Sequence, residues 1–157
     1  MIRTLFISIT CAAAALAVSP ALAQQADMSF FVTSSGPGKG DNLGGLDGAD
    51  AHCAALAKAA GATKTGWKAY LSTTAPQGEA GVNARDRIGA GPWQNAKGVV
   101  VAANGDELHS DKGNVTKETA LTEKGEIVLG RGDATNMQDI LTGSDPMGMY
   151  STAGGDT

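Results

Sequence analysis

Aromatic side chains are scarce in this sequence, at 4% of 157 residues, whereas glycine is abundant, at 22 residues. Glycine weakens the interiors of helices, because an unfolded glycine has more conformational freedom to lose than any other residue. This composition therefore argues against a helix bundle and predicts a domain rich in loops. The length is that of a single domain.

Neither sign of charge dominates the chain. It contains 12 Lys and Arg residues against 16 Asp and Glu residues, for a formal net charge of −4. Proteins that bind nucleic acid or anionic lipid usually carry a basic patch, and an acidic chain with scattered lysines has no such footprint. We therefore expect no nucleic-acid partner.

Long hydrophobic runs are absent after the first residues of the chain. Arg3 precedes an apolar stretch at residues 5–18, and Ala-Leu-Ala follows at residues 21–23. A positive start, a short apolar centre and an Ala-x-Ala ending are the parts of a secretory signal peptide. The stretch is shorter than the roughly 20 residues of a bilayer span. We predict a signal peptide at 1–23, a mature domain at 24–157 without a membrane span, and export to the periplasm or the medium. A buried N-terminal helix is the alternative.

Cysteine is rare, with two residues in the chain. Cys11 lies in the predicted signal peptide, so Cys53 alone remains after cleavage. A leftover cysteine in a secreted protein indicates a missing partner, an intermolecular bond or a buried free thiol. Composition favours the free thiol, because an unpaired cysteine behaves as a small hydrophobic residue.

The pattern along the chain indicates one main helix among short strands. Asp47 is a plausible N-cap for a helix that runs to about Ala60, with Gly61 as the residue that ends it. Ala49, Cys53 and Ala57 would share its buried face, with His52 and Lys58 off that face. Strands are predicted at 28–33, 66–72, 99–101 and 127–129, and a short helical turn at 85–88. Strands and a helix joined by glycine-rich loops predict an α+β domain.

The order of several motifs resembles a known family. The motifs are GGLDGADAHC at 44–53, TGWKAYLS at 65–72, ARDR at 84–87, DEL at 106–108 and TGSDPMG at 142–148. Together they resemble the front part of the endostatin-like domain, which has the C-type-lectin-like fold. The chain is more similar still to small exported bacterial proteins that are labelled lectins. The likeness covers nearly all of 30–157, and the block at 44–72 is its most specific part.

This resemblance implies that the C-terminal part of the fold is missing from the chain. In the family the domain continues for several dozen residues, and a later cysteine pairs with the cysteine that matches Cys53. Cys53 would then be one half of a disulfide whose partner is absent from this chain. Loss of a native disulfide typically costs a small secreted domain about 2–5 kcal/mol.

Metal ligands are too few for a convincing site. Endostatin binds zinc through N-terminal histidines and one aspartate; Asp106 matches the aspartate, but residues 24–29 contain no histidine. Zinc needs about four ligands, and His52 and His109 are interpreted as surface residues. Asp47 and Asp50 do not have the spacing of a calcium loop and suit the start of a helix. We expect neither a metal nor another cofactor.

Two short segments supply the candidate ligand contacts. Trp93 and Asn95 place an aromatic face beside an amide on one loop, as sugar sites often do. Trp93 could equally cover a small core, and Trp67 is interpreted as a core residue. Arg131 and Asp133 belong to an Arg-Gly-Asp tripeptide. A local interaction that shapes a turn is the alternative there.

Catalytic groups do not form a known motif. Cys53 is expected on a buried helix face, and neither histidine stands near a serine in a hydrolase pattern. We therefore predict an exported, lectin-like, non-catalytic module that binds a glycan or another envelope component. The alternative is a structural or protein-interaction domain of the cell envelope without a sugar site.

Overall fold

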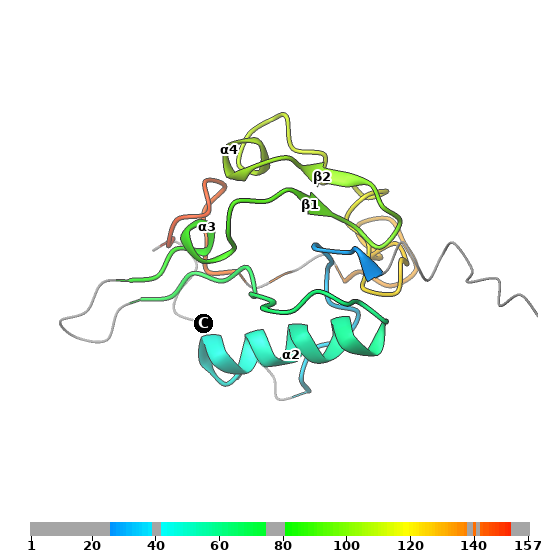
Figure 1. Cartoon of the computed structure of the whole chain (residues 1–157), viewed down its shortest axis with the longest axis horizontal. Coiled ribbons are helices and arrows are strands. Elements are labelled where there is room, and N and C mark those ends of the chain that lie inside the picture. Colours follow the sequence, from blue (N-terminus) through cyan, green and yellow to red (C-terminus); the bar gives the residue numbers. More distant parts are fainter. Residues whose placement is uncertain (1–25, 39–41, 75–80, 138–139, 141, 152–157) are drawn as a thin grey trace, which may run out of the picture.

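The computed structural model describes residues 26–38, 42–74, 81–137, 140 and 142–151. It is a mixed α+β structure with one main helix, a two-stranded antiparallel sheet and much irregular chain (Figure 1). The predicted signal peptide at 1–23 lies outside the described residues. None of the helices in the described part of the chain is long and apolar enough to cross a membrane. The elements are α2 (Gly45–Ala59), α3 (Ala84–Arg87), β1 (Trp93–Gln94), β2 (Val100–Ala102) and α4 (Gly105–Leu108).

Helix α2 ends where the sequence predicts and begins earlier. Gly61, at φ +88°, follows the C-cap Ala60, and the amides of Gly61 and Ala62 donate to the carbonyls of Lys58 and Ala57. These two bonds satisfy carbonyls that the helix end would otherwise leave free. The predicted N-cap Asp47 is wrong, because the cap is Gly44 in a left-handed conformation. Asp47 lies instead in the first turn, where its charge favours the positive end of the helix dipole.

The predicted strands are mostly not regular strands. The segment at 99–101 corresponds to β2, which pairs with β1 in the register Trp93 to Ala102. The segments at 28–33 and 127–129 contain only isolated bridges, between Val32 and Thr122 and between Leu121 and Ile127. The segment at 66–72 contains no strand residues. A strand forms only when a partner pairs with it along its length, and that partner is not visible in local sequence. The helical turn predicted at 85–88 is confirmed as α3.

Long-range hydrogen bonds hold the irregular segments together. The amides of Ser29 and Phe30 donate to the Gln94 carbonyl of β1, at 2.8 and 3.0 Å. A short turn at 142–151 closes on itself through the bridge between Ser144 and Tyr150. This turn lies beside α3 (Figure 1), where the Arg85 amide donates to the Gly148 carbonyl at 3.1 Å.

The buried apolar side chains form separate clusters instead of one continuous core. Helix α2 contributes Ala57 to one cluster and Ala49 to another, while β1 and β2 form a third. Each is small, and each is extended by partly buried neighbours. The buried members are Met28, Ala57 and Ala96; Ala49, Ala69 and Leu71; and Trp93, Val101 and Ala102.

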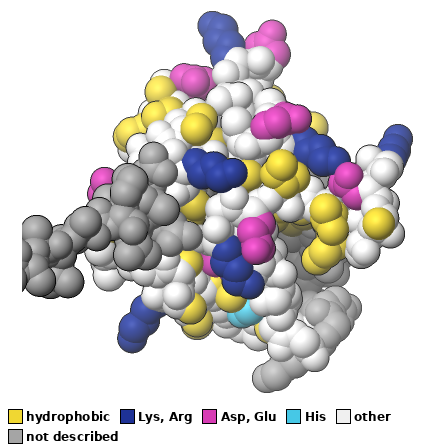
Figure 2. Space-filling model, turned by 90° about the vertical axis from the view of Figure 1, so that its right-hand side faces the viewer, with side chains coloured by type: hydrophobic (Ala, Val, Ile, Leu, Met, Phe, Trp, Pro, Cys, Tyr) yellow, Lys and Arg dark blue, Asp and Glu magenta, His cyan; other side chains and the backbone are white. Residues whose placement is uncertain are grey.

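Large apolar side chains are also exposed at the surface. Ile140 is 56% exposed and Met137 is 51% exposed. Figure 2 shows hydrophobic side chains scattered among charged ones over one face of the molecule. The others of this kind are Val99, Val100, Val115, Ile127, Leu129, Met147 and Met149.

Candidate functional site

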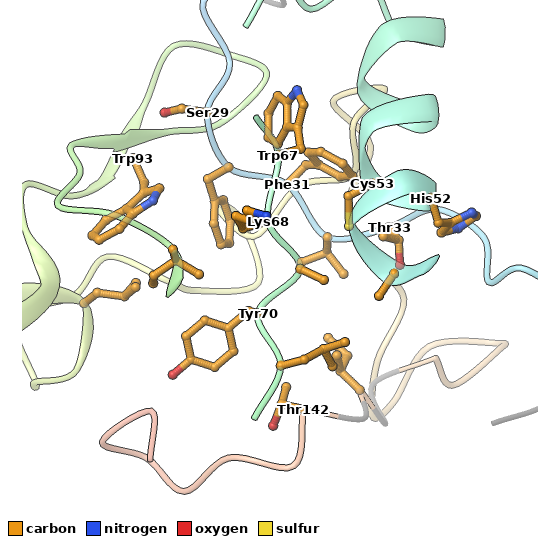
Figure 3. Close-up of a pocket in the computed structure, with 18 of the residues that line it drawn as sticks. Ser29, Phe31, Thr33, His52, Cys53, Trp67, Lys68, Tyr70, Trp93 and Thr142 are labelled. Atoms are coloured by element: carbon orange, nitrogen blue, oxygen red, sulfur yellow. The ribbon is translucent and has the colours of Figure 1, made fainter. Parts of the chain in front are cut away.

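An open groove of about 1010 Å³ lies between the apolar clusters. Its lining comes from segments far apart in the sequence. Figure 3 shows Trp67, Lys68 and Tyr70 along one segment, with Trp93 to one side and Cys53 on α2 to the other. The groove is large enough for a small-molecule ligand, because such pockets usually measure about 300–1,000 Å³.

Aromatic side chains are the most prominent part of this lining. Phe31 and Trp67 meet edge to face, with ring centroids 5.0 Å apart and an interplanar angle of 63°. The indole nitrogen of Trp67 donates to the Lys64 carbonyl at 3.0 Å, which fixes the ring's orientation. Rings held in place lose little freedom when a ligand stacks on them, so they are suited to binding.

Asp50 ties α2 to two other segments beside the groove. Its carboxylate accepts hydrogen bonds from Lys68 Nζ at 2.8 Å, from the Ala69 amide at 2.8 Å and from Arg87 at 3.0 Å. Burial alone would raise the pKa of Asp50, but the bonds from Lys68 and Ala69 and the charge of Arg87 outweigh it and lower the pKa. Asp50 therefore stays ionised and fixes the position of Lys68.

Tyr70 and His109 form a second polar pair at the groove. Nδ1 of His109 lies 2.6 Å from the Gly105 carbonyl, which can only accept, so Nδ1 carries the proton in the neutral ring. Nε2 then accepts a hydrogen bond from the Tyr70 hydroxyl at 2.9 Å. Burial and the nearby charge of Asp145 raise the pKa of Tyr70, so the phenol keeps its proton. His109 is 8% exposed, and its interpretation as a surface residue is wrong.

Cys53 is a free, partly buried thiol on the groove side of α2. Burial and the neighbouring charge of Asp50 raise its pKa, although Arg87 opposes this. The thiolate is the reactive form of cysteine, so this thiol is a poor nucleophile near neutral pH. The predicted absence of a disulfide partner from the chain stays a prediction.

Trp93 and Asn95, the first predicted pair of ligand contacts, have different surroundings. Trp93 lines the groove but is only 8% exposed and packs with Val101 and Ala102, so it also covers a core cluster. Asn95 is fully buried, and its amide donates to the Thr119 carbonyl at 2.9 Å while its oxygen accepts from two backbone amides of its own turn. The side chain of Asn95 is therefore occupied in holding this turn together.

The second predicted pair, Arg131 and Asp133, is not part of the groove lining. Asp133 accepts hydrogen bonds from Lys117 Nζ at 2.6 Å and from the Gly130 amide at 2.7 Å. The amide and Lys117 lower the pKa of Asp133. Arg131 is exposed. The structure therefore brings only Trp93 of the four predicted residues into the groove.

The groove residues missed by sequence reasoning come from the block at 65–72 and from the N-terminal segment. Trp67 was interpreted as a core residue, and no ligand contact was predicted for Lys68 or Tyr70. Trp67 is half-buried and packs against the cluster of Met28 and Ala57, as well as lining the groove. In this block the apolar residues Trp67, Ala69 and Leu71 alternate with Lys68, Tyr70 and Ser72. This alternation was the available signal, but it did not show that Phe31 lies opposite.

Candidate metal ligands are not gathered in the part of the chain that the structure describes. No group of three or more His, Cys, Asp or Glu side chains is placed there to hold an ion. Asp106, which the predicted resemblance aligns with a zinc ligand, lies 3.4 Å from Arg85 instead. His52 hydrogen bonds to the Ser35 carbonyl at 2.7 Å.

Comparisons with protein-family models, with curated proteins and with solved structures find no match for this chain. The resemblance to the endostatin-like domain therefore stays a prediction. Function has to be inferred from the groove itself.

Proposed function

We propose that the chain is an exported, non-catalytic module that binds a carbohydrate in the aromatic groove. The glycan would belong to the cell envelope or its surroundings. Export follows from the predicted signal peptide at residues 1–23, and the carbohydrate follows from the lectin-like resemblance together with the groove.

The observation that carries this proposal is the set of aromatic rings along the groove. Phe31, Trp67, Tyr70 and Trp93 all contribute to its lining. The C–H faces of a sugar ring are apolar, so they pack against aromatic faces, while a few polar groups fix the sugar's orientation. Lys68 and the Tyr70 hydroxyl are such polar groups beside these rings.

The proposal that the module is non-catalytic is supported by the protonation of its candidate nucleophiles. Cys53 and Tyr70 both have raised pKa values and hold their protons. Nε2 of His109 lies 2.9 Å from the Tyr70 hydroxyl. A nucleophile is activated by a base within reach or by a lowered pKa; His109 lies within reach of Tyr70, but the raised pKa values of Tyr70 and Cys53 oppose formation of the phenolate and the thiolate.

A second candidate function is protein interaction, and the exposed apolar side chains favour it. Met137, Ile140 and Met147 are each about half exposed. An exposed apolar patch often marks a protein interface, and Met137 and Ile140 both line the groove, so a protein segment could occupy the same apolar surface. On this hypothesis the envelope partner would be a protein, and no sugar would bind in the groove.

The test uses the mature protein, purified from the compartment into which it is exported. We expect binding to a subset of an oligosaccharide array, confirmed by calorimetry in solution. Substitution Trp67→Ala should weaken this binding by about tenfold or more, because stacked aromatics contribute strongly to recognition. Leu129→Ala, at an exposed apolar side chain outside the groove, is the matched control and should bind as the wild type does.

Two outcomes would contradict the carbohydrate proposal. An array without any bound glycan, combined with a protein captured by cross-linking on intact cells, would support the interaction domain. Equal glycan binding by Trp67→Ala, with its fold verified by circular dichroism, would place the sugar outside the groove.

A further inference from the structure

Given the proposed carbohydrate function, we propose that the bound glycan is anionic and that Lys68 is the residue that selects it. The chemistry required is an oxyanion, such as a carboxylate or phosphate, on a sugar whose ring stacks on the aromatic side chains. Lys68 lies on the same segment as Trp67 and Tyr70 (Figure 3).

The charge of Lys68 is not cancelled by its partner. The Asp50 carboxylate forms ion pairs with both Lys68 and Arg87. This cluster of two cations and one carboxylate therefore carries one surplus positive charge. The side chains of Asp50 and Arg87 are 12% and 11% exposed, whereas that of Lys68 is 49% exposed. Within the buried pair, Arg87 therefore neutralises the charge of Asp50. The positive charge of Lys68 remains exposed to solvent at the groove.

The contact with Asp50 also orients the ammonium group. Lys68 Nζ uses one of its three donors on Asp50 at 2.8 Å, which leaves two for a ligand. A free lysine pays side-chain entropy when it is ordered by an anion. Here part of that entropy is lost already on folding, so binding an oxyanion costs less.

The whole groove differs in charge from the rest of the chain. Its charged lining residues are Lys64, Lys68 and Asp145, which gives +1 with both histidines neutral, against −4 for the whole chain. One oxygen of the Asp145 carboxylate is already hydrogen-bonded, because Oδ1 accepts hydrogen bonds from the amides of Met147 and Met149 at 2.9 Å each. An acidic protein with a positive groove attracts an anionic ligand to that groove and repels it elsewhere.

The experiment compares matched acidic and neutral oligosaccharides on the mature protein. The probes are oligogalacturonate, the same oligomer as its methyl ester, and an array that also contains phosphorylated and sulfated glycans. The variants are Lys68→Met, which keeps the apolar stem without the charge, and Lys68→Arg, which keeps the charge. Lys58→Met removes an exposed lysine of α2 that does not line the groove and serves as the control.

We expect the bound glycans to be acidic, with binding about tenfold weaker or more in Lys68→Met. Lys68→Arg and Lys58→Met should retain most of the affinity, and the array shows which oxyanion is preferred. Binding of neutral glycans that Lys68→Met leaves unchanged would overturn this inference while the carbohydrate function stands. Failure to bind any glycan would overturn both.

Discussion

Asp50 shows how much of this molecule, whose buried apolar residues form separate clusters, depends on single polar residues. Its carboxylate joins α2 to the Ala69 amide and to Arg87 of α3, which is 37 residues further along the chain. The Asp50 and Arg87 side chains are about nine-tenths buried. A buried ion pair adds little net stability while it is intact, but it is costly when one partner is removed.

Substitution Asp50→Asn should lower the free energy of unfolding by about 3 kcal/mol at pH 7, because it leaves the buried Arg87 without its counter-charge. Urea unfolding monitored by circular dichroism measures the change. Asp47→Asn, an exposed position in the first turn of α2, is the control and should cost less than about 1 kcal/mol. Equal losses of unfolding free energy in the two variants would show that the buried pair of Asp50 and Arg87 does not contribute to stability.

The difference in unfolding free energy between the wild type and Asp50→Asn should also depend on pH. The pKa of Asp50 is lowered in the folded protein, so its ionised form favours folding at pH values above its unfolded pKa of about 4. That contribution is lost as the pH falls through the folded value. The difference between wild type and Asp50→Asn should therefore be constant near neutrality and shrink below about pH 4. A difference that grows on acidification would contradict this assignment.

Local sequence could not reveal these partners. Asp50 was interpreted as a residue that suits the start of a helix, and it does lie near the start of α2. Its contacts with Lys68 and Arg87 depend on how distant segments pack. His109 was expected at the surface for the same reason, since its burial comes from Tyr70 and from the turn at 142–151.

Among the elements, the helices were predicted better than the strands because helix signals are local. The end of α2 needs only Gly61 and the hydrogen bonds of the last turn, all within a few residues. The strand at 28–33 was wrong in detail because its amides pair with β1 and with Leu121, far along the sequence. Propensity therefore identified extended chain there but not whether it would join a sheet.

The turn at 142–151 is sensitive to a single added methyl group. Gly148 has φ +74°, and a Cβ at this position would lie 2.8 Å from the Tyr70 hydroxyl, 2.9 Å from Arg85 Cβ and closer still to His109 Nε2. Substitution Gly148→Ala should displace the turn and cost about 2–5 kcal/mol, because the overpacking adds to the backbone cost of alanine at positive φ. Hydrogen exchange of the Arg85 amide, which donates to the Gly148 carbonyl, should become faster.

The matched control for this substitution is Gly132→Ala. Gly132 has φ +91°, but no atom lies within 4 Å of the place that an alanine methyl group would take, so only the backbone cost of about 1–2 kcal/mol remains. The Arg85 amide should exchange as in the wild type in this variant. Unchanged exchange in Gly148→Ala as well would show that the turn does not dock on Tyr70 and His109.

For the molecule as a whole, composition predicted the general character better than the site. Abundant glycine and few aromatics indicated a loop-rich domain, the residue pattern indicated one main helix, and the structure has this α+β character. For Trp93 the sequence allowed two roles, and the residue both lines the groove and covers a cluster. The groove itself could not be predicted, because Phe31, Trp67 and Trp93 converge only through tertiary packing.

The groove between separate apolar clusters predicts that the native protein binds an apolar dye. Anilinonaphthalene sulfonate should bind at about one molecule per chain without denaturant, because the groove offers apolar surface already exposed to water. Trp67 and Trp93, the two tryptophans of the chain, both line the groove, so tryptophan excitation should sensitise the dye's emission. Val115→Asp, at a groove residue 46% exposed, should weaken dye binding, whereas Val99→Asp, at a residue 41% exposed outside the groove, should not. Equal weakening in both variants would mean that the dye binds a loosened state of the whole molecule, and the groove would not be a preformed site.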